Sequence, residues 1–403
     1  MNIDLLEDNP AWWTYLCVAA PMAVLILLAF LGLKYKLILR KYGAKLGKCL
    51  GHQRSRRGPH GDEENQTHAD KGPSMLNYFD AAACGHTIMV INSISSGIPI
   101  TAVDPRRNRR TALHFAAAGG HQATVRTLVS NFDADIEAKD GFNLTALHLA
   151  AEEGHEATVR ALVTGLGADV TAKDSAGRSA LHDAAGKGHE ATVRSLVCDL
   201  GADINAKDKQ NHTALHEAAS AGHEATVRLL TSLGADVMTK GDGDWTALHL
   251  AARNGHEATV RTLVTELGAD VKAKERNGRT PLHCAAQSNQ AAVVHALVTE
   301  LNADVEAKDK EDRTALHLVS NEGTIRLLVT VLGADIEAKD NMGMTPLHIA
   351  AFWNRWYSLR QVCTLVALNA NKEATTKDGD TPLDLARKGG HVETAHALGG
   401  RID

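Results

Sequence analysis

Residues 145–177 read TALHLAAEEGHEATVRALVTGLGADVTAKDSAG, and near copies of this stretch follow one another through most of the chain. The opening tetrapeptide or a close variant begins at nine positions, which are Thr111, Thr145, Ser179, Thr213, Thr246, Thr280, Thr314, Thr345 and Thr381. The spacings between successive copies are 34, 34, 34, 33, 34, 34, 31 and 36 residues. A nearly fixed period in this range predicts a stacked array of repeats instead of one thick core.

The residues of one unit predict two short helices. Thr145 suits a helix N-cap, and three units place proline at the next position, where a missing N–H costs nothing. The first helix should end at Gly154. A second helix over residues 156–166 would gather Val159 and Leu162 on one apolar face, and a glycine should then end it in a left-handed cap.

The tail of each unit, A-D-V-x-A-K-D in most copies, predicts an extended turn with a hairpin tip. Seven of these tails have glycine, asparagine or aspartate at the same tip position. These residues tolerate positive φ. These positions are Asn143, Gly177, Asn211, Asp244, Gly278, Asp312 and Gly343.

The period, the T-P-L-H-x-A-A pattern, the following G-H and the G-A-D-V ending together resemble the ankyrin repeat over residues 76–403. The resemblance implies an all-α ankyrin-repeat solenoid, with a helix-turn-helix and a β-hairpin loop in each unit. Residues 77–86 (NYFDAAACGH) resemble a degenerate first unit, and the last unit carries Asp384 in place of the repeated histidine. We therefore expect polar caps at both ends and about ten units in all.

Two units depart from the pattern. The unit at Thr314 reads HLVSNEGTIRLL and lacks three residues near its helix–helix turn, which predicts a shortened first helix. In the next unit, residues 351–362 (AFWNRWYSLRQV) place Phe352, Trp353 and Trp356 where other units have small or polar residues. Two interpretations stay open: these aromatic side chains form an interface hot spot, or they fill the gap left by the shortened neighbour.

Histidine is abundant, but its pattern indicates a structural role. Eight of the 21 histidines end the T-x-L-H motif and seven follow the glycine between the helices. In ankyrin-like units these imidazoles bond to backbone. The repeated H-E lacks the second histidine of H-E-x-x-H, and no P-loop, G-x-S-x-G or dinucleotide motif occurs. We therefore expect no enzyme activity, metal site, cofactor or small-molecule substrate, and the net charge of −5 gives no drive toward nucleic acid.

A stacked array presents a long face of first helices and a row of loop tips, where ankyrin-like proteins vary their side chains to contact protein partners. Each such residue alone is equally consistent with a solvated surface. The candidate partner-binding residues are Phe142, Glu152, Glu153, Arg178, Lys187, Trp245, Arg253, Asn254, Arg279, Gln287, Met342, Phe352, Trp353 and Trp356.

The N-terminal part predicts a membrane anchor. Residues 11–33 (AWWTYLCVAAPMAVLILLAFLGL) carry no charge and are long enough to cross a bilayer as a helix. A cleaved signal peptide is disfavoured, because residues 1–10 are acidic and no A-x-A follows the apolar core. Aromatic and basic residues flank the span, as is typical of membrane interfaces. They are Trp12, Trp13, Tyr15, Lys34, Lys36, Arg40 and Lys41.

The basic segment 34–57 holds nine lysines and arginines and no acidic residue, so it should stay on the cytoplasmic side. The short tail 1–10 would then lie outside and the repeats in the cytosol. The segment could lie on the membrane as an amphipathic helix or act as a solvated linker, and Cys49 within it could be acylated. Residues 58–75 are polar and predict a flexible linker.

Six cysteines are present, with no C-x-x-C pair. Four of them lie in apolar helical contexts, so we expect reduced core residues. The leading functional hypothesis is a protein-binding scaffold or adaptor held on a membrane by a single-pass helix. The alternatives are a soluble ankyrin adaptor and an accessory subunit of a membrane channel or transporter.

The predicted orientation can be tested by N-glycosylation, because Asn65, Asn143 and Asn211 each begin an N-x-Thr sequon that would be modified only in the lumen. With the repeats in the cytosol, all three asparagines should remain unglycosylated, and a glycosidase should leave the gel mobility of the cell-expressed protein unchanged. A glycosidase-sensitive shift that Asn65→Gln removes would place the repeats in the lumen instead.

Overall fold

The computed structural model describes residues 75–353 and 358–399. The predicted outside tail, membrane helix and basic segment all lie outside the described residues, as does nearly all of the predicted linker 58–75. Within the described part of the chain, no helix is both long enough and apolar enough to cross a membrane.

The described residues form a succession of antiparallel helix pairs. The first helices of the pairs are α3 (Met75–Ala83), α5 (Ala112–Ala118), α7 (Ala146–Glu152), α9 (Ala180–Gly186), α11 (Ala214–Ala221), α13 (Ala247–Asn254), α15 (Pro281–Gln287), α17 (Ala315–Leu318), α19 (Pro346–Phe352) and α21 (Pro382–Lys388). The second helices are α4 (Thr87–Ser95), α6 (Gln122–Phe132), α8 (Glu156–Arg160), α10 (Glu190–Arg194), α12 (Glu224–Ser232), α14 (Glu257–Arg261), α16 (Ala291–Thr299), α18 (Glu322–Arg326), α20 (Ser358–Ala367) and α22 (Val392–Ala397).

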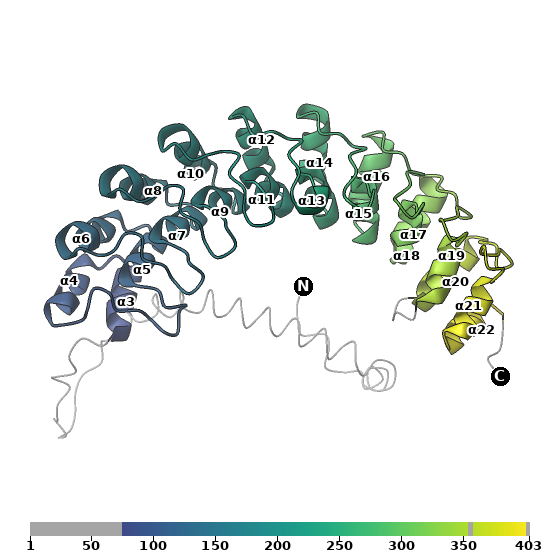
Figure 1. Ribbon diagram of the computed structural model, residues 1–403, viewed down its shortest axis with the longest axis horizontal. Helices are drawn as coiled ribbons and strands as arrows, with labels where there is room; N and C mark the ends of the chain where they lie inside the picture. Colours follow the sequence, from purple (N-terminus) through teal and green to yellow (C-terminus); the bar gives the residue numbers. More distant parts are fainter. Residues whose placement is uncertain (1–74, 354–357, 400–403) are drawn as a thin grey trace, which may run out of the picture. The chain divides into compact units, whose positions relative to one another are not determined.

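Successive pairs stack side by side in a curved row, and from α5 to α16 the first helices follow its inner edge and the second helices its outer edge (Figure 1). Small and large apolar residues alternate in the core. In the unit of α7 and α8, for example, Leu147, Ala150 and Ala151 are buried from α7. Val159 of α8 and Leu162 just after it are buried against them. Alanine lets neighbouring first helices approach closely, so each layer is thin and depends on its neighbours for burial.

The T-x-L-H motif caps the first helix and also joins two units. In α7, the Nδ1 atom of His148 accepts hydrogen bonds from the backbone N–H of Thr145 at 3.3 Å and from its hydroxyl at 2.9 Å. Nδ1 therefore carries no proton, and Nε2–H donates to the carbonyl of Arg178 in the next unit at 3.2 Å. The same arrangement recurs from His114 to His348. The predicted structural role of these histidines is confirmed.

The histidine after the inter-helix glycine reaches backward. His155 Nε2 bonds to the carbonyl of Ala118 in the preceding unit at 3.1 Å. Gly120 has φ +72°, and a Cβ there would lie 2.6 Å from His155 Nδ1, so glycine is required by both backbone and space. Gln290 replaces this histidine in one unit and still bonds to the carbonyl of Arg253 at 3.3 Å.

The last unit keeps the cap but loses the forward link. Asp384 stands where the other units have histidine, and its Oδ2 accepts the backbone N–H of Thr381 at 3.0 Å. A carboxylate has no counterpart of the imidazole Nε2–H donor. This arrangement fits the polar C-terminal cap expected from the sequence.

The loop tips follow the prediction in backbone angle but not in hydrogen bonding. All seven tip positions have positive φ, from 55° at Asn211 to 81° at Gly177. The described residues contain no β-strand, however, and a single isolated bridge joins Asp104 and Arg110. The β-hairpin part of the predicted fold is therefore wrong. Aspartate side chains take the place of a ladder: Asp140 Oδ1, for example, accepts two backbone N–H groups of its own loop.

Two helix predictions are refined. The second helix expected over residues 156–166 is α-helical only to Arg160 and continues as a π-helical turn, Ala161–Gly165, with similar turns at Ser195–Asp199, Thr262–Glu266 and Leu327–Val331. The shortened first helix at Thr314 is confirmed, because α17 has four residues.

The prediction that the cysteines are core residues is wrong at two positions. Cys198, in the π-helical turn after α10, and Cys363, in α20, are both exposed. Cys284 is buried in α15, and this burial raises its pKa to about 12.

The buried imidazoles make the array sensitive to acid. Burial lowers the pKa of His249 to about 4 and also lowers the pKa of His148. Between pH 6.5 and pH 4 the unfolded chain binds protons that the folded chain does not, so stability falls as the pH falls. For His249 alone the loss at pH 5 is about 2 kcal/mol. Urea midpoints followed by circular dichroism should drop steeply from pH 7 to pH 5. A flat profile over this range would contradict the neutral-imidazole arrangement.

Candidate partner-binding surface

The predicted partner-binding residues spread along the array and do not form one cluster. Within the described residues, the exposed ones are Phe142, Glu153, Lys187, Arg253, Asn254, Gln287, Met342, Phe352 and Trp353. Glu152, Arg178, Trp245 and Arg279 are half-buried. Trp356 lies outside the described residues.

Several of these side chains already bond to one another across neighbouring units. Lys187 pairs with Glu152 at 3.2 Å. The guanidinium of Arg253 lies 5.5 Å from the ring centre of Trp245, within the range of a cation–π interaction. Such pairs link α7 to α9 and a loop tip to α13, so these residues also contribute to the surface packing of the array.

Three of the predicted residues meet at a cavity of about 220 Å³ beside the short helix α17. The cavity exists because α17 ends early and the chain becomes extended at Val319, whose ψ is 146°. The carbonyl of Val319 accepts a hydrogen bond from Gln361 Nε2 at 2.6 Å. The lining residues are Arg279, Gln287, Arg313, His317, Leu318, Val319, Ser320, Ile349, Trp353 and Gln361.

The charges that line this cavity are balanced. Arg313 bonds to Asp309 and Glu311 at 2.9 and 2.7 Å, while Arg279 lies 3.7 Å from Asp309 and donates to Gln287 at 3.1 Å. The cavity therefore presents polar groups without a strong net charge.

Two exposed aromatic rings stand at the rim. Trp353 lines the cavity and packs edge-to-face on Phe352, with their ring centres 5.3 Å apart. Phe352 remains 46% exposed and Trp353 50% exposed. Contiguous exposed apolar patches commonly mark interaction sites, and this pair adjoins a cavity.

Two acidic residues on neighbouring first helices, Asp183 and Glu217, were not among the residues predicted from the sequence. The residue after the T-x-L-H histidine is apolar in most units, but it is Asp183 in α9 and Glu217 in α11. Burial raises the pKa of Asp183 to about 7, and its Oδ2 has no hydrogen-bond partner, although Arg178 lies 3.4 Å from Oδ1. The signal was present as a break in the apolar pattern at this one repeat position.

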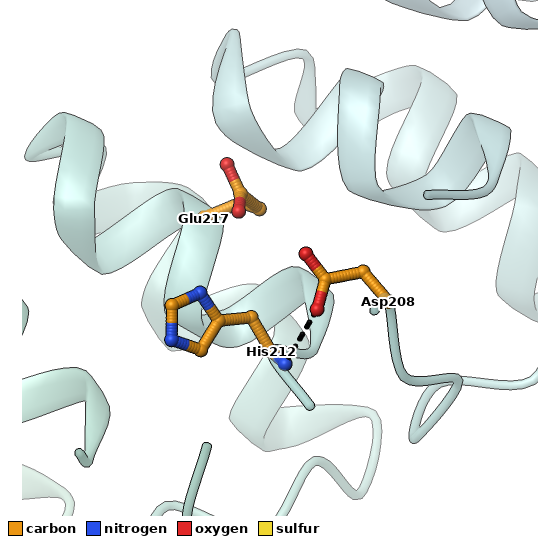
Figure 2. A group of neighbouring side chains, drawn as sticks. All are labelled: Asp208, His212 and Glu217. Atoms are coloured by element: carbon orange, nitrogen blue, oxygen red, sulfur yellow. Dashed lines mark hydrogen bonds between the residues drawn. The ribbon is translucent and has the colours of Figure 1, made fainter. Parts of the chain in front are cut away.

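One group of side chains in the described residues combines donors that a metal ion could use. Asp208, His212 and Glu217 come together at the start of the α11 unit (Figure 2). Their spacing in the sequence matches no zinc motif, so sequence reasoning gave no metal site here.

A comparison with protein families bears on the whole array. The family described as "Ankyrin repeats (3 copies)" matches residues 78–174, 167–241, 239–309 and 301–375, which together span more than half of the chain. The chain belongs to the ankyrin-repeat family. The resemblance read from the repeated motif is therefore confirmed, and ankyrin repeats indicate a protein–protein interaction domain. The ankyrin fold is typically a non-enzymatic module.

Solved ankyrin structures similar to this chain include two domains. The human ASB11 ankyrin repeat domain is 27% identical, covers 55% of this chain and 97% of its own length, and has a TM-score of 0.49. The ankyrin repeat domain of Bcl-3, described as a unique member of the IkappaB protein family, is 29% identical, with 55% and 100% coverage and a TM-score of 0.46. No curated protein matches the sequence.

The buried carboxyl of Asp183 should cost the ankyrin array stability. Its pKa is raised above the ordinary value, so the folded state disfavours the ionised form and stability is lost as the pH rises from about 4 to 7. Asp183→Leu, which restores the residue of the preceding unit, should raise the melting temperature. The gain should be roughly 2 kcal/mol larger at pH 8 than at pH 5.5. An equal gain at both pH values would show that the carboxyl is ionised without penalty.

Proposed function

We propose that this ankyrin-repeat protein is a non-enzymatic adaptor that holds a protein partner on the inner face of its array and is tethered to a membrane by residues 11–33. The observation that carries the binding part is the cavity beside α17 with Phe352 and Trp353 at its rim. It is the place where the predicted contact residues of separate units converge.

The cavity suggests how a partner would bind. An apolar side chain of the partner would pack on Trp353 and enter the cavity, where Leu318, Val319 and Ile349 provide apolar lining. Polar groups of Gln287 and Gln361 flank this lining and can bond to partner backbone. Because the arginines there are balanced by carboxylates, recognition would depend on shape and apolar burial more than on net charge.

The tether rests on sequence. The uncharged stretch 11–33 is long enough to cross a bilayer, and the basic segment that follows favours a cytosolic array. With such an anchor the array would concentrate its partner at the membrane. A soluble adaptor and an accessory subunit of a channel or transporter share the binding surface and differ in this anchoring.

Substitution of the aromatic pair tests the binding part. The double variant Phe352→Ala/Trp353→Ala should reduce capture of the partner at least tenfold in quantitative affinity capture from cells, because loss of such anchors costs about 2 kcal/mol or more. Its melting temperature should stay within a few degrees of the wild type, since both side chains are half exposed.

The matched control is Ile88→Ala/Met89→Ala, which removes two adjacent exposed apolar side chains of α4 that neither line the cavity nor belong to the predicted contact residues. Capture by this control should match the wild type. Equal capture by all three proteins, or a large fall in the melting temperature of the Phe352/Trp353 variant, would refute the proposed binding site and favour a packing role.

Deletion of residues 1–50 tests the tether. The full chain should remain in the membrane pellet after alkaline carbonate extraction, because an inserted helix resists conditions that strip peripheral proteins. The deleted chain should move to the supernatant and still capture the partner. A full chain that carbonate releases would favour the soluble adaptor.

A further inference from the structure

Three side chains of one unit with potential metal-ligand atoms lie close together. Asp208 lies in the loop, His212 lies just before the N-cap Thr213, and Glu217 lies in the first turn of α11. One donor atom from each residue lies within 4.8 Å of the other two, and all three side chains are half-buried (Figure 2).

The carboxylate of Asp208 is held in place and keeps one oxygen available. Its Oδ1 accepts the backbone N–H groups of Gln210 and His212, both at 2.8 Å. In the preceding unit the equivalent second oxygen, Asp174 Oδ2, is taken by Arg178 at 3.0 Å. His212 replaces that arginine, and among the described residues no donor bonds to Asp208 Oδ2.

The following unit differs from most others at the residue that faces the His212 imidazole, which is Gly241. Most other units carry an acidic residue at the loop position that Gly241 occupies, and Asp140 there bonds to Arg110 of the unit before it at 3.1 Å. A Cβ at position 241 would overlap the His212 ring. Gly241 therefore makes room for the ring and also removes the carboxylate that would otherwise have paired with residue 212.

The ring and the surrounding charge suit a cation. His212 stacks on the buried His216, with ring centres 5.1 Å apart and planes 10° apart, which fixes its orientation. Asp174, Asp208 and Arg178 lie close enough to Glu217 to act on its charge, so the group carries more negative than positive charge. Within the described residues the ring nitrogens of His212 accept or donate no hydrogen bond, and they are available as ligands.

We propose that Asp208, His212 and Glu217 bind a divalent transition-metal ion, with Zn²⁺ as the best match. One imidazole and two carboxylates are ligands that zinc accepts, whereas Ca²⁺ and Mg²⁺ prefer oxygen-only sites with more ligands. Zinc–ligand distances of about 2.0–2.2 Å require donors closer together than they now lie. A rotation of the Glu217 side chain would be needed to bring its carboxylate inward, and water would complete the coordination.

The test is a titration of ZnCl₂ into the EDTA-treated full chain at pH 7.5 by isothermal calorimetry, with CoCl₂ as a spectroscopic probe. His212→Arg installs the arginine of the preceding unit, and Glu217→Gln removes one charged ligand. Each should abolish one equivalent of zinc binding or weaken it at least a hundredfold. Bound Co²⁺ should show the visible absorption of a low-coordinate site in the wild type and lose it in both variants.

The matched control is His295→Asn, which removes an exposed imidazole of α16 far from the cluster. It should bind zinc as the wild type does. Circular dichroism in EDTA should show the same helical content for all four proteins, which separates loss of the site from loss of the fold. Equal zinc stoichiometry and affinity in the wild type and in His212→Arg would overturn the proposal, as would binding of Ca²⁺ in preference to Zn²⁺.

Discussion

The neutral imidazole of the T-x-L-H motif is the interaction on which the array depends. Its Nδ1 closes the helix cap of its own unit and its Nε2 holds the loop of the next unit, so one side chain fixes local structure and stacking together. The second histidine, which reaches back to the preceding unit, adds the opposite link. Both bonds end on backbone carbonyls, and the layers can therefore vary their surface side chains without losing register. This freedom is what makes the inner face available for binding.

Local features of the array were predictable because each lies within a few residues of sequence. Thr145 and His148 are three residues apart, and the positive φ of Asn143 depends on its own loop alone. The β-hairpin prediction was wrong although the backbone angles of the tips were right. The tail of each unit suggested paired strands, whereas the Asp140 side chain satisfies the backbone donors that a ladder would have used.

Features that need the stacking register could not be read from the sequence. The cavity beside α17 joins Arg279, Trp353 and Gln361, which meet only when three units are stacked. The shortened repeat was visible, but the volume it would leave was not. Likewise, the sequence does not show why position 241 is glycine. The structure does, because the His212 ring occupies the space that a side chain at this position would need.

The shortness of α17 also bears on how the array responds to force and thermal motion. In a one-dimensional stack, cooperativity passes only between neighbours, and the joint with the least shared surface is where it is interrupted. A four-residue helix offers less surface to α15 and α19 than the other first helices offer to theirs. We therefore expect the array to unfold as two cooperative blocks that meet at this joint, beside which the proposed binding cavity lies. A partner bound there would contact both blocks and stabilise the joint between them. Binding would then make the whole array stiffer.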